Sequence, residues 1–232
     1  TLITGDNWSI ANTRLSIIDT SSIANQPFTD KNEKYYLSFN GEIYNYQTLR
    51  RRLLDEGIKF ETFSDTEVLF KLLIIKGLEQ TLKVIEGMFS FIFFDKVNNT
   101  VYGARDQLGQ KPLHYFLKNN LFSICSEIPP LLKLNNTIEP DLTSWRTYLC
   151  SSGIISKEDT FFLDIKALPA GHCFKFNNGN LKLNKYFDVT DLHDGRKVNI
   201  QSLEKNVSVL DTIFKKSIKK HIISDVPIGV LC

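Results

Sequence analysis

The sequence predicts an α+β protein, the fold class in which strands and helices occupy separate stretches of the chain. Three observations support this: short β-favouring runs joined by asparagine-containing turns, a few amphipathic helical segments between them, and a change of pattern near residue 195. The chain has 232 residues, enough for one large domain and the beginning of a second. Its 42% hydrophobic and 23% charged residues exclude a disordered or low-complexity protein.

The net charge and hydropathy of the sequence limit the kinds of molecule that the protein is expected to bind. The formal net charge of +2 gives no basis for a surface that binds nucleic acid or membrane. No apolar run reaches the roughly 18 residues that a membrane helix needs. The four cysteines and four histidines lack the spacing of metal ligands. We therefore expect no nucleic-acid partner, no membrane association and no metal site.

The first third of the chain is predicted as strand, strand, helix. Residues 10–18 include a short β-favouring stretch, and residues 35–39 form a second one. Asn40-Gly41 follows as a turn dipeptide, because both residues tolerate a positive φ. Residues 46–54 are then predicted as a helix, since their leucines recur on one face.

A capping box begins the next helix. In the string 64–67, Ser64 has the position of an N-cap and Glu67 lies three places further on, where its carboxylate can reach back to the cap. The helix is expected to end at Gly77, because glycine commonly ends helices, and a second helix is expected over residues 78–86.

Hairpins dominate the middle of the chain. Three pairs of β-favouring runs are separated by turns that contain asparagine. A helix is expected from Asp141 or Thr143 to residue 149, and Pro129-Pro130 is expected to delay or distort a helix start. The paired runs are residues 88–95 with 100–105, 114–117 with 121–125, and 172–176 with 181–187.

The pattern changes after residue 188. Residues 188–199 are polar and predict a linker, whereas residues 200–221 place apolar side chains at three- and four-residue steps, as an amphipathic helix does. Residues 226–231 predict a strand. Because this helix–strand order is how an α/β unit begins, we place a domain boundary near residue 195.

Three places carry residue types suited to binding a free amino acid. Arg14 lies in an apolar stretch and could hold a carboxylate, whereas Asp65, at a helix start, could hold an ammonium group. Asn40 and Gly41 could supply N–H donors to an oxyanion. Spacing alone leaves the ordinary alternatives open: a surface salt bridge, a helix cap and a hairpin turn.

An ordered series of short strings runs along nearly the whole chain. The strings are Arg14-Leu15-Ser16-Ile17-Ile18-Asp19, Phe39-Asn40-Gly41-Glu42-Ile43-Tyr44-Asn45, Ser64-Asp65-Thr66-Glu67, Gly87-Met88-Phe89, Ala104-Arg105-Asp106, Lys111-Pro112-Leu113, Ser126-Glu127, Leu168-Pro169-Ala170-Gly171 and Asp225-Val226-Pro227. Together they resemble the glutamine-using asparagine synthetases and, more widely, the class II glutamine amidotransferases.

The resemblance implies a fold and two domains. Residues 1–195 would form a glutaminase domain, N-terminally incomplete, with the four-layer αββα sandwich of the N-terminal-nucleophile hydrolases. Residues 196–232 would be the first helix and strand of an α/β, ATP-dependent synthetase domain, truncated at its C-terminal side. The chain is therefore expected to be a fragment of a longer enzyme.

The resemblance also implies residue roles. Arg14 would hold the α-carboxylate of glutamine, Asp65 and Glu42 would bind near its α-ammonium group, and Asn40 with Gly41 would form the oxyanion hole. The backbone of Leu15, Ser16, Ile17 and Ile18 would line the same pocket. Met88 would line an internal ammonia channel, although a plain core residue is an equally acceptable interpretation of this methionine.

In this family a cysteine at the mature N-terminus attacks the glutamine amide. That nucleophilic cysteine is missing from the chain, so we expect the fragment itself to be inactive. The parent would transfer glutamine-derived ammonia to ATP-activated aspartate, giving asparagine, AMP and pyrophosphate. ATP and Mg²⁺ would serve the parent, with none expected on this fragment, and Leu231 and Cys232 would stand where the ATP-binding phosphate loop begins.

Two alternatives remain open. A related amidotransferase acting on a sugar, a peptide or another carboxylate would share these strings, because the acceptor site lies beyond them. A glutamine-binding module without catalysis would share them as well. We expect a cytoplasmic protein, and the oligomeric state is left open between a monomer and a homodimer.

Overall fold

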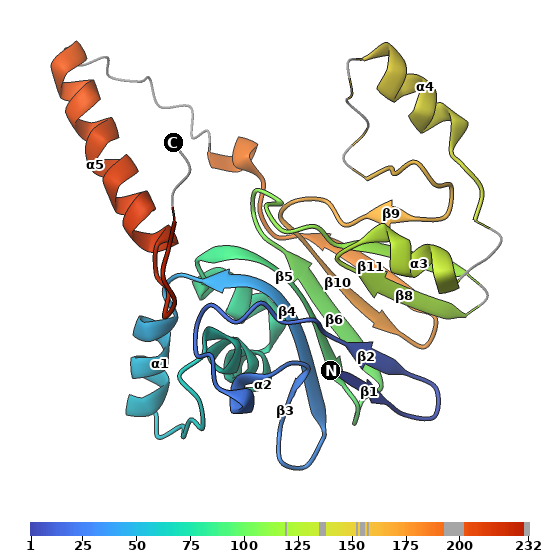
Figure 1. Cartoon of the computed structure of the whole chain (residues 1–232), viewed down its shortest axis with the longest axis horizontal. Coiled ribbons are helices and arrows are strands. Elements are labelled where there is room, and N and C mark those ends of the chain that lie inside the picture. The colour runs from blue at the N-terminus through green and yellow to red at the C-terminus, as the bar shows by residue number, and fades with distance from the viewer. Residues whose placement is uncertain are drawn as a thin grey trace. The chain divides into compact units, whose positions relative to one another are not determined.

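The computed structural model describes residues 1–118, 120–134, 138–151, 153, 156, 158–192 and 202–229. Contacts divide the chain into two compact units, which are described separately (Figure 1). The first unit comprises residues 1–12, 26–42 and 88–188. The second comprises residues 13–25, 43–87 and 189–232.

A six-stranded sheet forms the body of the first unit, in the order β11-β10-β6-β5-β4-β3. The β3/β4, β5/β6, β6/β10 and β10/β11 pairs are antiparallel. This confirms the predicted hairpins over residues 88–105 and 172–185. The strands are β3 (Phe28–Thr29), β4 (Tyr35–Ile43, whose last residue belongs to the second unit), β5 (Gly87–Asp95), β6 (Thr100–Arg105), β10 (His172–Asn177) and β11 (Asn180–Lys185).

A second sheet packs on the first. It has the order β8-β7-β9, with the predicted hairpin of β7 (His114–Lys118) and β8 (Leu121–Cys125) beside the short β9 (Lys166–Ala167). Phe122 of β8 stacks on Phe176 of β10 with ring centroids 4.3 Å apart and meets Phe174 edge-on at 5.6 Å. These aromatic contacts join the two sheets face to face through a shared apolar core.

Helix α3 (Ile128–Leu134) covers the other side of the small sheet. Its Leu131 is buried in one cluster with Phe116 of β7 and Ile165. The expected disturbance by Pro129-Pro130 does not occur, because both prolines lie in the first turn. There a missing N–H removes no helical hydrogen bond. The first unit thus contains helix, sheet and sheet in successive layers.

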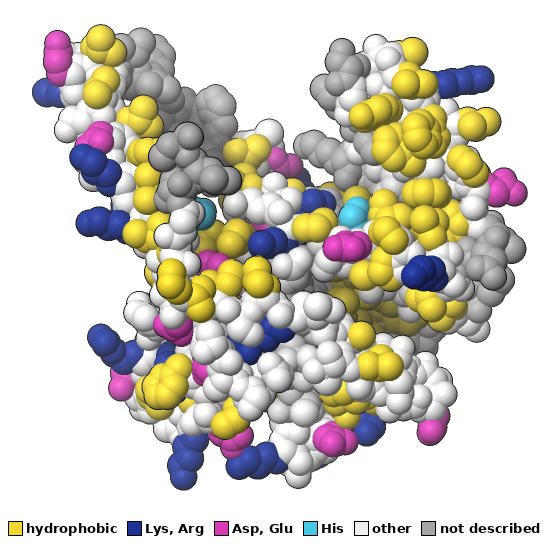
Figure 2. Space-filling view, viewed as in Figure 1, with side chains coloured by type: hydrophobic (Ala, Val, Ile, Leu, Met, Phe, Trp, Pro, Cys, Tyr) yellow, Lys and Arg dark blue, Asp and Glu magenta, His cyan; other side chains and the backbone are white. Residues whose placement is uncertain are grey.

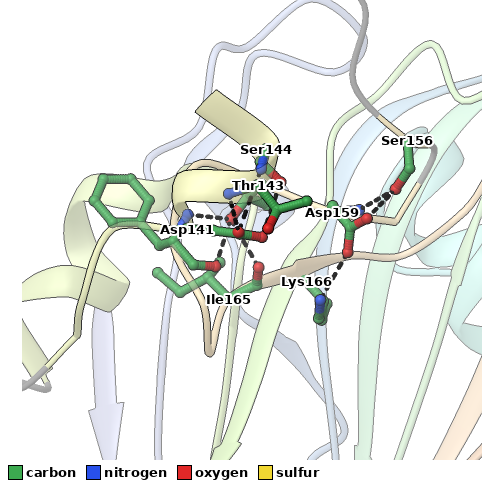
Figure 3. Close-up of polar contacts among 9 residues, drawn as sticks. Asp141, Thr143, Ser144, Ser156, Asp159, Ile165 and Lys166 are labelled. Atoms are coloured by element: carbon green, nitrogen blue, oxygen red, sulfur yellow. Dashed lines mark hydrogen bonds and ion pairs between the residues drawn. The ribbon is translucent and has the colours of Figure 1, made fainter. Parts of the chain in front are cut away.

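Helix α4 (Leu142–Cys150) begins at one of the two predicted caps. The Asp141 carboxylate accepts hydrogen bonds from the amides of Thr143 and Ser144 at 2.9 and 3.2 Å, so Asp141 rather than Thr143 is the cap (Figure 3). Nearby, Asp159 accepts from Lys166 Nζ at 2.7 Å. The hydrogen bond from Lys166 is the main cause that lowers the pKa of Asp159.

The N-terminal hairpin of β1 (Leu2–Thr4) and β2 (Ser9–Ala11) also belongs to the first unit. Only its second strand falls in the predicted stretch of residues 10–18. Trp8, in the turn, packs on Tyr36 and Phe94 with centroid distances of 4.9 and 5.1 Å. The hairpin therefore adds its own aromatic cluster to the core.

Helices α1 (Tyr46–Asp55) and α2 (Asp65–Val84) lie next to each other in the sequence of the second unit. Helix α1 matches its prediction, and α2 contains both predicted helices, joined across a kink at Gly77 with φ +72°. Ser64 Oγ accepts from the amide of Glu67 at 3.2 Å, as predicted. In a capping box, the Glu67 carboxylate would accept a hydrogen bond from the amide of Ser64. Here it accepts from the amides of residues 61 and 62 instead.

The chain of this unit continues through a short 3₁₀ turn, η2 (Val189–Leu192), to helix α5 (Leu203–His221); another such turn, η1 (Ser22–Ala24), lies earlier. No side chain of α5 is buried among the described residues. Apolar side chains line it in Figure 2, and Phe214 is 61% exposed. Residues 226–229 form no strand, so that part of the predicted strand over 226–231 is wrong, and the remainder lies outside the described residues.

Candidate functional site

Strand β4 carries Asn40 and Gly41 in its extended run, so the predicted hairpin turn is wrong. Gly41 has φ +147°, which glycine adopts far more easily than other residues. A Cβ added there would lie 2.0 Å from the carbonyl oxygen of Met88 and 2.7 Å from the Cα of Phe89. Because the two backbones approach so closely, only glycine fits at position 41. Met88 contacts this candidate oxyanion-hole residue through its main chain.

Ser126 links Asn40 to the second sheet. Its hydroxyl lies 3.5 Å from Asn40 Nδ2, and its carbonyl oxygen lies 3.2 Å from Nδ1 of half-buried His114. Burial lowers the pKa of His114, and the charge of Arg105 lowers it further, against the opposing effect of the carbonyl contact. No local pattern in the sequence predicts this role of Ser126, because its partner lies 86 residues away.

Asp65 lies at the N-terminus of α2 and is 4% exposed. Its Oδ2 accepts a hydrogen bond from the amide of Ile43 at 3.0 Å. Ile43 is two residues after Gly41, so the carboxylate fixes the chain where β4 ends. Glu42, the residue between them, is also buried, at 7% exposure. Ser64 rather than Asp65 is the cap of α2, and the Asp65 carboxylate instead bonds the last residue of β4.

Arg14 closes a loop formed by residues 14–19. Its NH2 donates to the carbonyls of Ile18 and Asp19 at 2.8 and 2.5 Å, and its NH1 to that of Ser21 at 3.3 Å. These bonds use three of the five N–H donors of a guanidinium. Arg14 is thus held by carbonyl oxygens rather than by a surface salt bridge, and two of its donors take no hydrogen bond among the described residues.

Along this loop, the backbone segment predicted to line a pocket is unevenly exposed. Leu15 is 84% exposed, Ser16 and Ile17 are partly buried, and Ile18 is 5% exposed. Ile18 therefore anchors the loop while Leu15 projects from it.

Asp19 organises the end of the Arg14 loop, and the sequence analysis gave it no role. It has φ +52°, a conformation that aspartate tolerates better than most residues. Its carboxylate accepts from the Ser21 hydroxyl at 2.5 Å and from the Phe63 amide at 2.7 Å. Burial raises the pKa of Asp19, but these hydrogen bonds and the charge of Arg14 outweigh it, so the pKa is lowered.

Asp106 supports the strand that faces Gly41. This buried carboxylate accepts hydrogen bonds from four amides, at 2.9–3.2 Å, and one of them belongs to Phe89 of β5. Arg105 beside it donates to the carbonyls of Gly109, Lys111 and Leu168 at 2.7–2.8 Å. An aspartate two to five residues ahead of the loop amides that it bonds is the signal that could have identified this support.

The predicted residues separate between the two units. Asn40, Gly41, Glu42 and Met88 belong to the first, whereas residues 14–18 and Asp65 belong to the second. Leu231 and Cys232, predicted to bind ATP, lie outside the described residues. Across the described ranges, no cluster of three or more His, Cys, Asp or Glu is arranged to hold a metal. Within the same ranges, no helix has the length and apolar character needed to cross a membrane.

Comparison with known proteins gives this α+β architecture its class. A sequence family described as a glutamine amidotransferase domain matches residues 1–187. Since this match spans most of the chain, the protein belongs to the glutamine amidotransferase domain family.

Individual relatives agree with the family. The chain is 34% identical over 217 residues to asparagine synthetase [glutamine-hydrolyzing] 1 of Bacillus subtilis (strain 168), which covers 93% of this chain and 33% of the relative. It is 32% identical over 227 residues to asparagine synthetase B of Escherichia coli (strain K12), with 97% and 35% covered. The chain thus spans about a third of the length of these relatives.

Among solved structures, a glutamine phosphoribosylpyrophosphate amidotransferase from B. subtilis, in complex with ADP and GMP, aligns with a TM-score of 0.49 at 20% identity. The alignment covers 70% of this chain and 32% of that one.

Proposed function

We propose that this chain recognises L-glutamine as the glutaminase part of an asparagine synthetase. The observation that carries the proposal is the geometry of Gly41. Its φ of +147° and the approach of Met88 to 2.0 Å from an added Cβ leave its amide in a backbone conformation that only glycine accepts. Such a preorganised N–H donor is what an oxyanion hole needs.

The residue roles follow from side-chain chemistry. We assign the two remaining donors of Arg14 to the α-carboxylate of glutamine, since guanidinium groups bind carboxylates well. Asp65 and Glu42, both buried carboxylates, are assigned to the α-ammonium group. The amide of Gly41 and Nδ2 of Asn40 would stabilise the oxygen that becomes negative when the amide carbon is attacked.

Hydrolysis itself requires a nucleophile, which we propose to be an N-terminal cysteine of the complete enzyme. Its sulfur would bond to the amide carbon, and ammonia would leave with the proton taken from the thiol. Water would then cleave the thioester to give glutamate. None of the four cysteines of these 232 residues is the first residue, so we expect the 232 residues expressed alone to bind glutamine without hydrolysing it.

The remaining expectations extend this proposal beyond the described residues. We propose that residues 1–195 belong to a four-layer αββα sandwich, and that α5 is the first helix of a synthetase domain. None of the apolar side chains of α5 is buried among the described residues, and this supports the proposal, because such a face is stable only when another element packs on it. Aspartate would be the acceptor and ATP with Mg²⁺ would activate it. Met88 keeps its proposed place along the ammonia path.

The test is an assay of the protein expressed from its complete coding sequence. Glutamate release from L-glutamine is measured first, then asparagine formation in the presence of aspartate, ATP and Mg²⁺. We expect both products, and we expect Arg14→Lys to raise the KM for glutamine by about tenfold, because one ammonium group cannot bond the three loop carbonyls and the α-carboxylate together.

Two controls make the outcomes separable. Ammonia supplied in place of glutamine is expected to restore asparagine formation in Arg14→Lys. Glutamate release without asparagine would keep the glutaminase and reassign the acceptor to a sugar, a peptide or another carboxylate. No glutamate release by the wild-type protein would overturn the proposal.

A further inference from the structure

The C-terminal end of α5 and the turn after it contact several segments of the second unit. Lys220 pairs with Glu86. The ring of His221 lies 4.5 Å from the ring of Tyr44, which directly follows β4. Beyond the helix, Asp225 reaches the Arg14 loop. The same short segment therefore contacts three parts of the unit that are distant in sequence.

Asp225 makes two hydrogen bonds to the Arg14 loop. Its amide donates to the carbonyl of Ile17 at 3.0 Å, and its Oδ2 accepts from the amide of Asp19 at 2.8 Å. Both partners are backbone groups of the Arg14 loop. A donor and an acceptor used together fix the orientation of the loop as well as its distance from Asp225.

The turn that presents Asp225 is itself hydrogen-bonded. The Ser224 hydroxyl donates to the carbonyl of Val226 at 2.9 Å and accepts from the Val226 amide at 3.1 Å. Asp225 lies between these two residues, so its backbone is held while its carboxylate faces the loop. The contact is therefore presented by an ordered turn.

Asp19 connects the contact with Asp225 to both residues predicted to bind glutamine, Arg14 and Asp65. Its carbonyl accepts from Arg14 at 2.5 Å, and its carboxylate accepts from the amide of Phe63, two residues before Asp65. Holding the amide of Asp19 keeps it in its φ +52° conformation, in which those two bonds are made. Without the Asp225 acceptor, that uncommon conformation loses a restraint.

We propose that Asp225 is a positioning residue for the glutamine site, acting through the backbone of Ile17 and Asp19 to hold Arg14 in its ligand-binding orientation. The inference rests on the proposed function, since it presumes that Arg14 binds the carboxylate of glutamine. It links the segment after α5 to glutamine affinity, although no atom of Asp225 is assigned a contact with the substrate.

The experiment measures L-glutamine binding to the 232-residue chain by NMR titration, together with amide hydrogen exchange at Asp19. Asp225→Ala is expected to raise the dissociation constant about tenfold, the factor for losing one hydrogen bond that involves a charged group. Exchange at Asp19 should accelerate in the same variant. Asp225→Asn keeps an acceptor oxygen and is expected to stay within about threefold of the wild type.

Asp211→Ala is the matched control, because Asp211 is an exposed carboxylate on α5 whose ion pair with Lys215 lies within the helix. It is expected to change neither readout. Faster exchange at Asp19 with unchanged glutamine affinity would overturn the inference and leave the proposed function standing. If the wild-type chain shows no glutamine binding, the proposed function fails, which is a separate result.

Discussion

Two loops of this protein use the same pair of residue types for different purposes. The loop at Arg105 and Asp106 lies in the first unit, and the loop from Arg14 to Asp19 lies in the second. In both, the arginine donates to backbone carbonyls and the aspartate accepts from backbone amides. The residue types alone therefore do not distinguish a structural loop from the one that we propose to bind a ligand.

Burial and the number of bonds make the difference. Asp106 is 1% exposed and accepts from four amides, whereas Asp19 is only partly buried and accepts from the backbone amides of Ser21 and Phe63. Burial also lowers the pKa of Arg105. We infer that the Arg105 loop holds the fold and the Arg14 loop is kept for a ligand.

The largest expected effect is on the buried loop. Asp106→Ala leaves three loop amides and the Phe89 amide of β5 without their acceptor and should lower the free energy of unfolding by about 4 kcal/mol. Asp19→Ala should cost about 1 kcal/mol, because its partners can turn to water. Urea unfolding of the two variants, with exposed Asp6→Ala as the neutral control, measures the contrast. Equal losses in the free energy of unfolding of the Asp106 and Asp19 variants would contradict the proposed difference between the two loops.

Strand β5, which Asp106 supports, approaches Gly41 of β4 too closely to leave room for a side chain there. Gly41→Ala combines an unfavourable φ with a 2.0 Å clash and should cost about 3 kcal/mol. Gly57→Ala is the matched control, since Gly57 has φ +84° but nothing within 4 Å of an added Cβ. It should cost about 1 kcal/mol from backbone strain alone. If thermal unfolding gives the same loss for both, the close approach of Met88 is not what selects glycine.

Replacing Arg105 or Arg14 with lysine tests directly whether the two loops serve different roles. Arg105→Lys should lower the free energy of unfolding by about 2 kcal/mol, because one ammonium cannot bond three carbonyls in different directions. Arg14 also bonds three carbonyls, but its loop is partly exposed and those carbonyls can bond water instead, so Arg14→Lys should cost only about 0.5 kcal/mol while weakening glutamine binding. Unfolding and binding are measured on both proteins. A stability loss at Arg14 that matches Arg105 would contradict the assignment of Arg14 to a ligand.

The smallest effect is a pH dependence at His114, near the charge of Arg105. Because burial places its folded pKa below the ordinary 6.5, the neutral ring favours folding. That contribution is full above the unfolded pKa and is lost as the pH falls through the folded pKa. His114→Phe should therefore lose less stability than the wild type on acidification from about pH 7.5 to about pH 5. Urea midpoints at the two pH values check the sign, and a steeper loss in the variant would refute it.

Local chemistry explains what could be predicted from the sequence. Ser64 and Asp141 cap helices through amides two or three residues away, and Gly77 interrupts a helix through its own φ. The hairpins likewise depend on short turns. Each of these features is decided within a few residues, so a pattern in the sequence is enough to indicate it.

Long-range contacts explain what could not. Asn40-Gly41 has the composition of a turn, but pairing in the six-stranded sheet and the backbone of Met88 keep it extended. Ser126 and Asp225 act on partners 86 and 206 residues away, and no spacing in the sequence signals either contact. The residues with candidate ligand chemistry were identified by resemblance, whereas the residues that hold them in place appear only in the structure.

The most direct test of the account is an L-glutamine titration of the isotope-labelled chain followed by NMR. We predict saturable shifts in the amides of residues 14–18, of Gly41 and of Asp65, with none in residues 105–111. L-glutamate and D-glutamine, as matched comparators, should shift the same amides far less. Saturable shifts centred on residues 105–111, or no shifts at all up to about 50 mM glutamine, would contradict the central claim.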